Sequence, residues 1–110
     1  MEFGLSDKTC ATIRHILGQY PQIEKAVLYG SRAKGNYKNG SDIDLTLTGA
    51  ALDHRLLFSV ANALDDSDIP YTVDLSLFDR IENQALREDI ERVGAVFYQR
   101  ADAGDGQVAL

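Results

Sequence analysis

Residues 30 to 45 read Gly30-Ser31-Arg32-Ala33-Lys34-Gly35-Asn36-Tyr37-Lys38-Asn39-Gly40-Ser41-Asp42-Ile43-Asp44-Leu45, and the rest of the chain can be placed around them. The apolar run at residues 26–29 stops at Gly30, as a buried strand does where the backbone turns sharply. A glycine there can adopt a positive φ and lets an anion approach the main chain, while the Ser31 hydroxyl and the following N–H groups can donate to its oxygens. The turn therefore predicts a phosphate-binding loop at Gly30 and Ser31.

Two aspartates follow this turn. Ten residues separate Ser31 from Asp42, and Asp42-Ile43-Asp44 leads into an alternation of apolar and polar residues that is typical of a strand. Side chains two apart on a strand share a face, so Asp42 and Asp44 project together, about 6.5–7 Å apart along the backbone. Such carboxylates repel each other unless a cation binds, and Mg²⁺ takes one or two carboxylates together with substrate phosphates. The pattern predicts a metal site.

Local roles would also explain these residue types. Asp42 could cap a turn together with Ser41, and Gly30 could simply end a strand. An EF-hand calcium loop fits the sequence less well, because its later oxygen ligands and final glutamate are missing after Asp44.

Composition bounds the functional classes. The chain has 110 residues, of which 45% are hydrophobic and 25% charged, as expected for one soluble globular domain. The net charge of −6 argues against direct nucleic-acid binding. Arg32, Lys34 and Lys38 place positive charge where nucleotide phosphates would arrive, although they could equally form a solvated loop. A single cysteine, Cys10, and the absence of a signal peptide or membrane-length apolar run favour the cytoplasm and no membrane association.

Periodicity predicts the other elements: a helix at residues 6–20, strands at 23–29, 42–48 and 71–77, a helical turn at 32–34, and helices at 52–65 and from about 79 to 99. Asp79 could cap the last helix, whose apolar face would include Leu86, Ile90, Val93 and Phe97. The loop between the first two strands is too short for a parallel crossover, so these strands should be antiparallel. Residues 1–100 should form the domain, and residues 101–110 a disordered tail.

Asp74 lies in the third predicted strand. A helix-containing connection permits this strand to run parallel to the second one, which would bring Asp74 beside Asp42 and Asp44. The carboxylate could instead protect a sheet edge from aggregation. The element order predicts an α/β (α+β) fold, with a small mixed sheet of three or more strands flanked by helices.

The string that contains Gly30-Ser31-Arg32-Ala33, Gly35, Ser41-Asp42 and Asp44-Leu45 resembles the signature of the DNA-polymerase-β-like nucleotidyltransferase superfamily. It is most similar to the minimal nucleotidyltransferase (MNT) family, antitoxins that accompany HEPN-domain toxins. The resemblance implies transfer of AMP from ATP, with two Mg²⁺ ions, to a hydroxyl acceptor such as a tyrosine of a HEPN-type toxin.

The resemblance also assigns roles to residues. Asp42, Asp44 and Asp74 would be the catalytic residues and metal ligands, and Asp74 could also take the acceptor proton. Nucleotide-binding residues would be Gly30, Ser31, Arg32 and Lys34, the first two on the phosphates and the basic pair as electrostatic helpers.

Two rival functions remain open. An antitoxin could neutralise its partner by binding alone, with an idle nucleotide site, although the intact aspartates and Gly30-Ser31 favour an active enzyme. The chain could also modify a small molecule, but it has no room for an acceptor-binding domain. A partner, in a homo- or hetero-oligomer, would have to supply acceptor recognition.

Overall fold

The computed structural model describes residues 2–101. Its elements in chain order are α1 (Asp7–Leu17), β1 (Lys25–Tyr29), α2 (Ser31–Lys34), β2 (Ile43–Thr48), α3 (His54–Asp65), β3 (Val73–Leu77), the 3₁₀ turn η1 (Phe78–Arg80), α4 (Gln84–Val93) and β4 (Ala95–Gln99). The tail predicted at residues 101–110 lies, apart from Ala101, outside the described residues. Within residues 2–101, no helix is both long enough and apolar enough to span a membrane.

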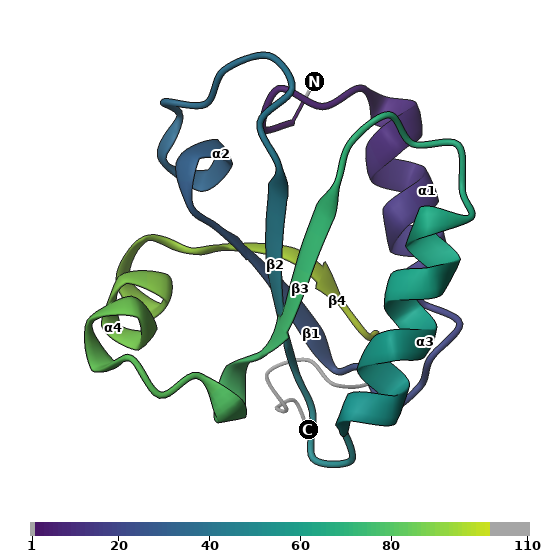
Figure 1. Ribbon diagram of the computed structural model, residues 1–110, viewed down its shortest axis with the longest axis vertical. Helices are drawn as coiled ribbons and strands as arrows, with labels where there is room; N and C mark the ends of the chain where they lie inside the picture. The colour runs from purple at the N-terminus through teal and green to yellow at the C-terminus, as the bar shows by residue number, and fades with distance from the viewer. Residues whose placement is uncertain (1, 102–110) are drawn as a thin grey trace.

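The strands form one mixed sheet in the order β3-β2-β1-β4 (Figure 1). β1 is antiparallel to both β2 and β4, and β2 is parallel to β3. The antiparallel and parallel pairings predicted from the loop lengths are therefore confirmed. The parallel register pairs Asp44 with Asp74, so the topology alone brings these two aspartates to neighbouring strands.

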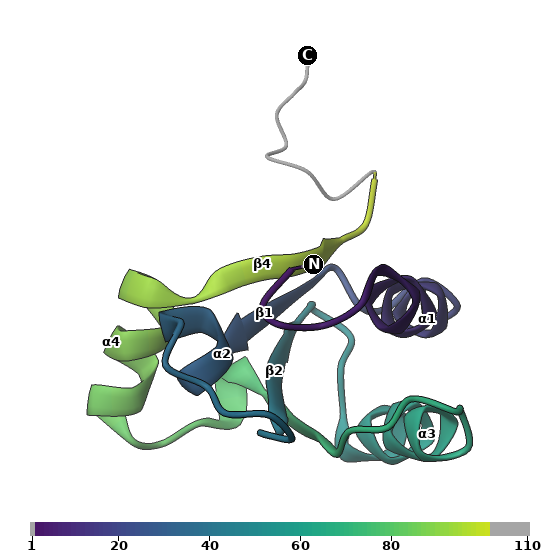
Figure 2. The same ribbon diagram turned by 90° about the horizontal axis from the view of Figure 1, so that it is seen from above.

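Helices cover the sheet unequally. Figures 1 and 2 show α1 and α3 together on one side of the sheet, with α2 and α4 on the other. The main core lies under α1 and α3 and includes the inward side chains of the two central strands, Ala26, Leu28, Ile43, Leu45 and Leu47, none more than 1% exposed. Because successive strand residues point to opposite faces, Asp44 and Asp74 lie on the face turned away from this core.

The C-terminal segment corrects the sequence prediction. One helix was expected to reach about Gln99, but α4 ends at Val93 and Ala95–Gln99 forms β4. Gly94 interrupts the helix, and the following Ala-Val-Phe-Tyr run suits a strand. β4 pairs with the free edge of β1, which satisfies backbone groups that a longer helix would leave unpaired. Phe97 still reaches the core, at 2% exposure.

Short polar side chains set the helix starts. The Ser6 and Asp53 side chains accept from the N–H groups of Thr9 and Leu56, at 3.1 and 2.9 Å. The prediction that Asp79 caps the last helix is wrong: Asp79 lies within η1, and Asn83 caps α4 by accepting from the Leu86 N–H. Other boundaries differ by two or three residues: α1 ends at Leu17, β1 begins at Lys25, α3 at His54 and β3 at Val73.

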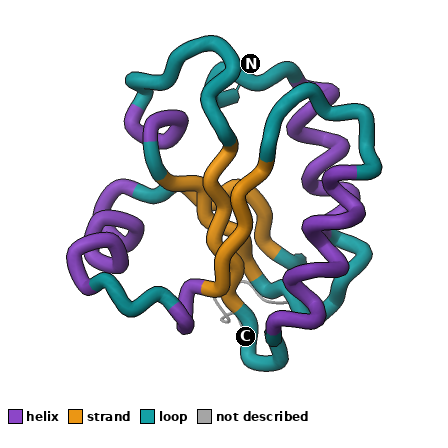
Figure 3. Tube along the Cα trace, viewed as in Figure 1, coloured by secondary structure: helices purple, strands orange, loops and turns teal. Residues whose placement is uncertain are grey.

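Three connecting segments gather at one end of the sheet. Figure 3 shows that the N-terminal segment, the loop from α2 to β2 and the loop before β3 meet beyond the ends of β2 and β3. Asp42 lies in the second of these segments, one residue before β2 begins. The candidate site therefore lies where loops converge on the N-terminal ends of the parallel strands β2 and β3.

Candidate active site

The turn after β1 has the predicted backbone. Gly30 adopts φ 78° and ψ −155°, a conformation that a residue with a side chain rarely takes. A Cβ at this position would lie 2.6 Å from the Asp44 Oδ2 atom, so the carboxylate occupies the space that a side chain would need. The single helical turn α2 starts at Ser31, and the first N–H groups of any helix have no acceptor within it. Gly30 thus brings the turn that was predicted to bind phosphate into contact with Asp44.

The three predicted aspartates lie at one end of the sheet. Asp44 is half-buried on β2 and opposite Asp74 in the parallel register, whereas Asp42, two residues before Asp44, is exposed like Asp74. Partial burial, and then the nearby carboxylates of Asp74 and Asp42, raise the pKa of Asp44 above its ordinary value of 3.8. The charges of Asp74 and Asp42 therefore both act on Asp44.

The donor set suits a hard divalent cation, which favours carboxylate oxygens and would relieve the repulsion around Asp44. The side chains are not assembled into a complete ligand set, because no three acidic, histidine or cysteine side chains in residues 2–101 converge closely enough to hold a metal ion. Mg²⁺ needs only one or two carboxylates when phosphates and water complete its octahedron. The neighbouring carboxylates of Asp44 and Asp74 are sufficient in number for such a site, and Asp42 lies two residues before Asp44.

Tyr29 is a neighbour of these carboxylates that the sequence prediction missed. It ends β1 opposite Asp44 and is half-buried. Burial raises the pKa of the Tyr29 phenol, the nearby Ser76 hydroxyl lowers it in part, and the charges of Asp44 and Asp74 raise it further. Residues 26–29 form an apolar run in the sequence, but strand alternation, with Ala26 and Leu28 inward, places Tyr29 on the aspartate face.

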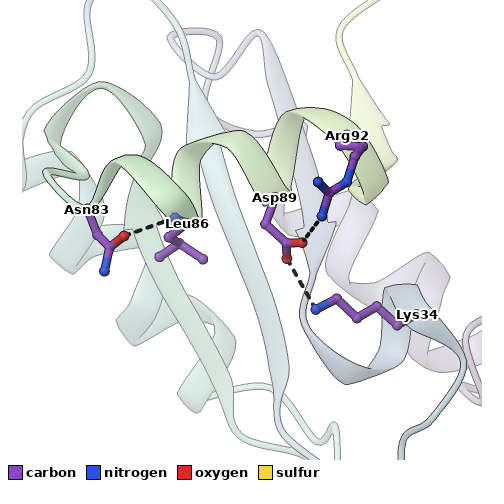
Figure 4. A network of polar contacts seen from close by, with 5 residues as sticks. All are labelled: Lys34, Asn83, Leu86, Asp89 and Arg92. Carbon is purple, nitrogen blue, oxygen red and sulfur yellow. Dashed lines mark hydrogen bonds and ion pairs between the residues drawn. The ribbon is translucent and has the colours of Figure 1, made fainter.

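The two basic residues predicted to meet phosphates both have partners within the protein. Arg32 is only 3% exposed, and its guanidinium donates to main-chain carbonyl oxygens of Phe3 and Ser41. Lys34 is half-exposed, and its Nζ lies 3.3 Å from the Oδ2 atom of Asp89 on α4 (Figure 4). The Oδ1 atom of the same carboxylate accepts a hydrogen bond from Arg92. A phosphate that recruits Lys34 must compete with a surface ion pair, which is a weak obstacle.

Comparison with known proteins identifies the family of the chain. A family model described as polymerase beta, nucleotidyltransferase, matches residues 11–103. The chain belongs to the polymerase beta nucleotidyltransferase family. The family membership suggested by the Gly-Ser and Asp-x-Asp motif is therefore confirmed, and the protein contains a nucleotidyltransferase domain.

Individual proteins share little sequence with this nucleotidyltransferase, although the similarity extends over most of the chain. It is 28% identical over 110 residues to the probable protein adenylyltransferase MntA of Haemophilus influenzae, which covers 99% of this chain and 96% of the relative. A crystal structure of a toxin–antitoxin with AMP-PNP matches with a TM-score of 0.68 and 23% identity, over 84% of this chain and 75% of that one. A mutant of the toxin–antitoxin MntA-HpeT matches with a TM-score of 0.62 and 18% identity, over 89% and 76%. The shared fold confirms the predicted polymerase-β-like architecture.

The raised pKa of Asp44 predicts a pH-dependent stability effect. In metal-free protein at pH 7, Asp44→Asn is expected to raise the free energy of unfolding. Between 3.8 and the higher native pKa of Asp44, the native state binds more protons than the unfolded state, so wild-type stability falls as pH rises through this window. The advantage of the variant should therefore vanish below about pH 3.8. Urea titrations at about pH 3 and pH 7 measure it, and a destabilised variant at pH 7 would contradict the electrostatic explanation.

Proposed function

We propose that this nucleotidyltransferase is an Mg²⁺-dependent adenylyltransferase that moves AMP from ATP to a tyrosine hydroxyl of a HEPN-type toxin, and so acts as the antitoxin of a toxin–antitoxin pair. The observation that carries the proposal is the pairing of Asp44 with Asp74 beside the positive-φ turn at Gly30. Carboxylates for a cation and a turn for phosphates are the two parts that nucleotidyl transfer requires.

Each residue has a role in this reaction. Gly30 and Ser31 hold the β- and γ-phosphates through the hydroxyl and the main-chain N–H groups. Asp42, Asp44 and Asp74 would hold two Mg²⁺ ions, which supply the positive charge that neutralises the phosphate oxygens. The acceptor oxygen bonds to the α-phosphorus, the bond to the bridging oxygen breaks, and pyrophosphate leaves. Exposed Asp74 takes the proton of the attacking hydroxyl.

The relatives support the choice of acceptor. The similar protein from Haemophilus influenzae is named a probable protein adenylyltransferase, and both similar crystal structures are toxin–antitoxin assemblies. The HEPN identity of the partner rests on the resemblance of the Gly30–Leu45 motif. Adenylylation would add negative charge beside a ribonuclease site and repel RNA phosphates. The net charge of −6 suits docking on a basic RNA-binding surface.

We also propose residues 1–100 as the domain and the cytoplasm as its compartment, consistent with the free Cys10.

Incubation of the protein with the product of the adjacent gene, ATP and Mg²⁺ tests the proposal. We expect the partner to gain the mass of AMP on a tyrosine and to lose ribonuclease activity. The double variant Asp42→Asn/Asp44→Asn should do neither. A matched control, Asp66→Asn/Asp68→Asn, removes the same charge from two exposed residues after α3 and should behave as wild type.

Other outcomes would decide for the rival functions. Inhibition of the partner by wild type and double variant alike, without a mass change, would support an antitoxin that acts by binding alone. An unmodified partner together with ATP-dependent modification of a small molecule would support a nucleotidyltransferase that acts on small molecules.

A further inference from the structure

Arg32 is a charged residue in an unusual place. It is 3% exposed, and it directly follows Ser31 of the phosphate turn. Buried charges need partners. Within residues 2–101, however, no carboxylate lies within ion-pair distance of its guanidinium; its hydrogen-bond partners are main-chain oxygens. The side chain is therefore held by the backbone of other segments.

Two segments supply these oxygens. The Nε and NH2 atoms of Arg32 both donate to the Ser41 carbonyl, at 3.1 and 2.9 Å, and the NH1 atom donates to the Phe3 carbonyl at 2.8 Å. The guanidinium also lies over the rings of Tyr37 and Tyr71, with its carbon 5.0 and 4.8 Å from their centroids. Carbonyl oxygens therefore contact the edge of the guanidinium, and tyrosine rings pack against its plane.

Two of the segments that Arg32 contacts lead directly to the aspartates. Ser41 immediately precedes Asp42, and Tyr71 lies in the loop that leads to Asp74 on β3. On the other side of Asp42, the Ile43 N–H donates to the Thr72 carbonyl at 2.9 Å. Both backbone neighbours of Asp42 are therefore anchored, one by Arg32 and one by the loop before β3. An exposed carboxylate on an anchored backbone loses little freedom when it binds a ligand.

We propose that Arg32 is a positioning residue, which fixes Asp42 relative to the Gly30–Ser31 turn, and that it does not contact the triphosphate. This role rests on the proposed function of the site, and it replaces phosphate binding by Arg32 as predicted from the sequence. A planar guanidinium can hold one carbonyl with two parallel N–H groups, whereas the point charge of a lysine cannot.

Arg32→Lys tests the role, with Arg87→Lys as a matched control. Arg87 likewise donates to a main-chain carbonyl and lies over an aromatic ring, both of Phe78, but it is on α4. In nucleotide-free protein, we expect amide hydrogen exchange of Ser41 and Ile43 to speed up by about tenfold in Arg32→Lys. Exchange at Val60 and Leu64, in the core part of α3, should remain unchanged, and Arg87→Lys should leave Ser41 and Ile43 as in wild type.

Nucleotide binding separates positioning from direct contact. ATP affinity without metal should change by less than about threefold in Arg32→Lys, because the phosphate turn is intact, whereas the Mg²⁺ concentration for half-maximal transfer should rise by about tenfold. Unchanged exchange at Ser41 and Ile43, or a loss of metal-free ATP affinity as large as that in Ser31→Ala, would overturn the proposal.

A milder variant covers failure of Arg32→Lys to fold. Tyr37→Leu removes one ring face from the guanidinium and leaves the hydrogen bonds of Arg32 in place, so exchange at Ser41 and Ile43 should rise by about threefold. Absence of this rise would overturn the proposal in that case. The exchange measurements need neither nucleotide nor partner, so they test the positioning role independently of the proposed function. If the proposed function is wrong, Asp42→Asn/Asp44→Asn should bind ATP and respond to Mg²⁺ as wild type does.

Discussion

The Gly30→Val substitution is expected to lower the transfer rate by about a thousandfold and ATP affinity by about 10- to 100-fold. A β-branched residue at φ 78° is strained by about 1–3 kcal/mol, which alone corresponds to a loss of up to about a hundredfold. Its Cβ would also lie 2.6 Å from the Asp44 Oδ2, so the carboxylate must move. One substitution should thereby disturb both the proposed phosphate turn and the strand that carries the proposed metal ligand Asp44. Calorimetry with ATP and single-turnover transfer measure the two effects.

Ser31→Ala is the natural comparison for Gly30→Val. It deletes one hydroxyl donor and leaves the main-chain N–H groups in place, so ATP affinity should fall by only about tenfold. If Gly30→Val is folded, as judged by its circular dichroism and melting curve, and still binds ATP normally, the phosphate turn lies elsewhere in the protein.

The double substitution Asp42→Asn/Asp44→Asn is expected to remove the effect of Mg²⁺ on ATP binding and to lower transfer by at least about a thousandfold. Without metal, ATP should bind the variant at least as tightly as wild type, because two negative charges no longer repel the triphosphate. Calorimetric titrations of both proteins, each with and without Mg²⁺, give the four affinities. Equal affinities in all four titrations would contradict the metal site.

The melting temperature of the same variant distinguishes a functional role from a structural one. Asp42 is exposed and Asp44 is repelled by its neighbours, so the metal-free double variant should be at least as stable as wild type. A marked decrease in melting temperature would mean that these carboxylates hold the fold together. The exposed pair Asp66→Asn/Asp68→Asn controls for the change in net charge.

Most of the candidate site could be predicted from local patterns. The alternation around Ile43 and Leu45 put Asp44 on the face away from the core, and the structure agrees. The turn at Gly30 was predicted from a strand-ending glycine followed by serine, and its φ is positive as expected. Both predictions depend only on residues close in the sequence, for which the period of a strand and the backbone freedom of glycine are sufficient.

The end of the domain could not be predicted in this way. Leu86, Ile90, Val93 and Phe97 have helical spacing, yet Phe97 lies on β4. The deciding partner is β1, whose edge is about 70 residues away and needs hydrogen bonds that the local pattern does not reveal. Pairing with a distant strand overrode a helical period that held only as far as Gly94.

The sequence by itself determined the family, the order of the elements up to β3, the relative directions of β1, β2 and β3, and the face on which Asp44 and Asp74 lie. These follow from periodicity, loop length and a motif within sixteen residues. Only the tertiary structure decided that Arg32 holds Ser41 and that Tyr29 stands opposite Asp44. Long charged side chains can reach many partners, and which one they meet depends on segments that approach only when the chain has folded.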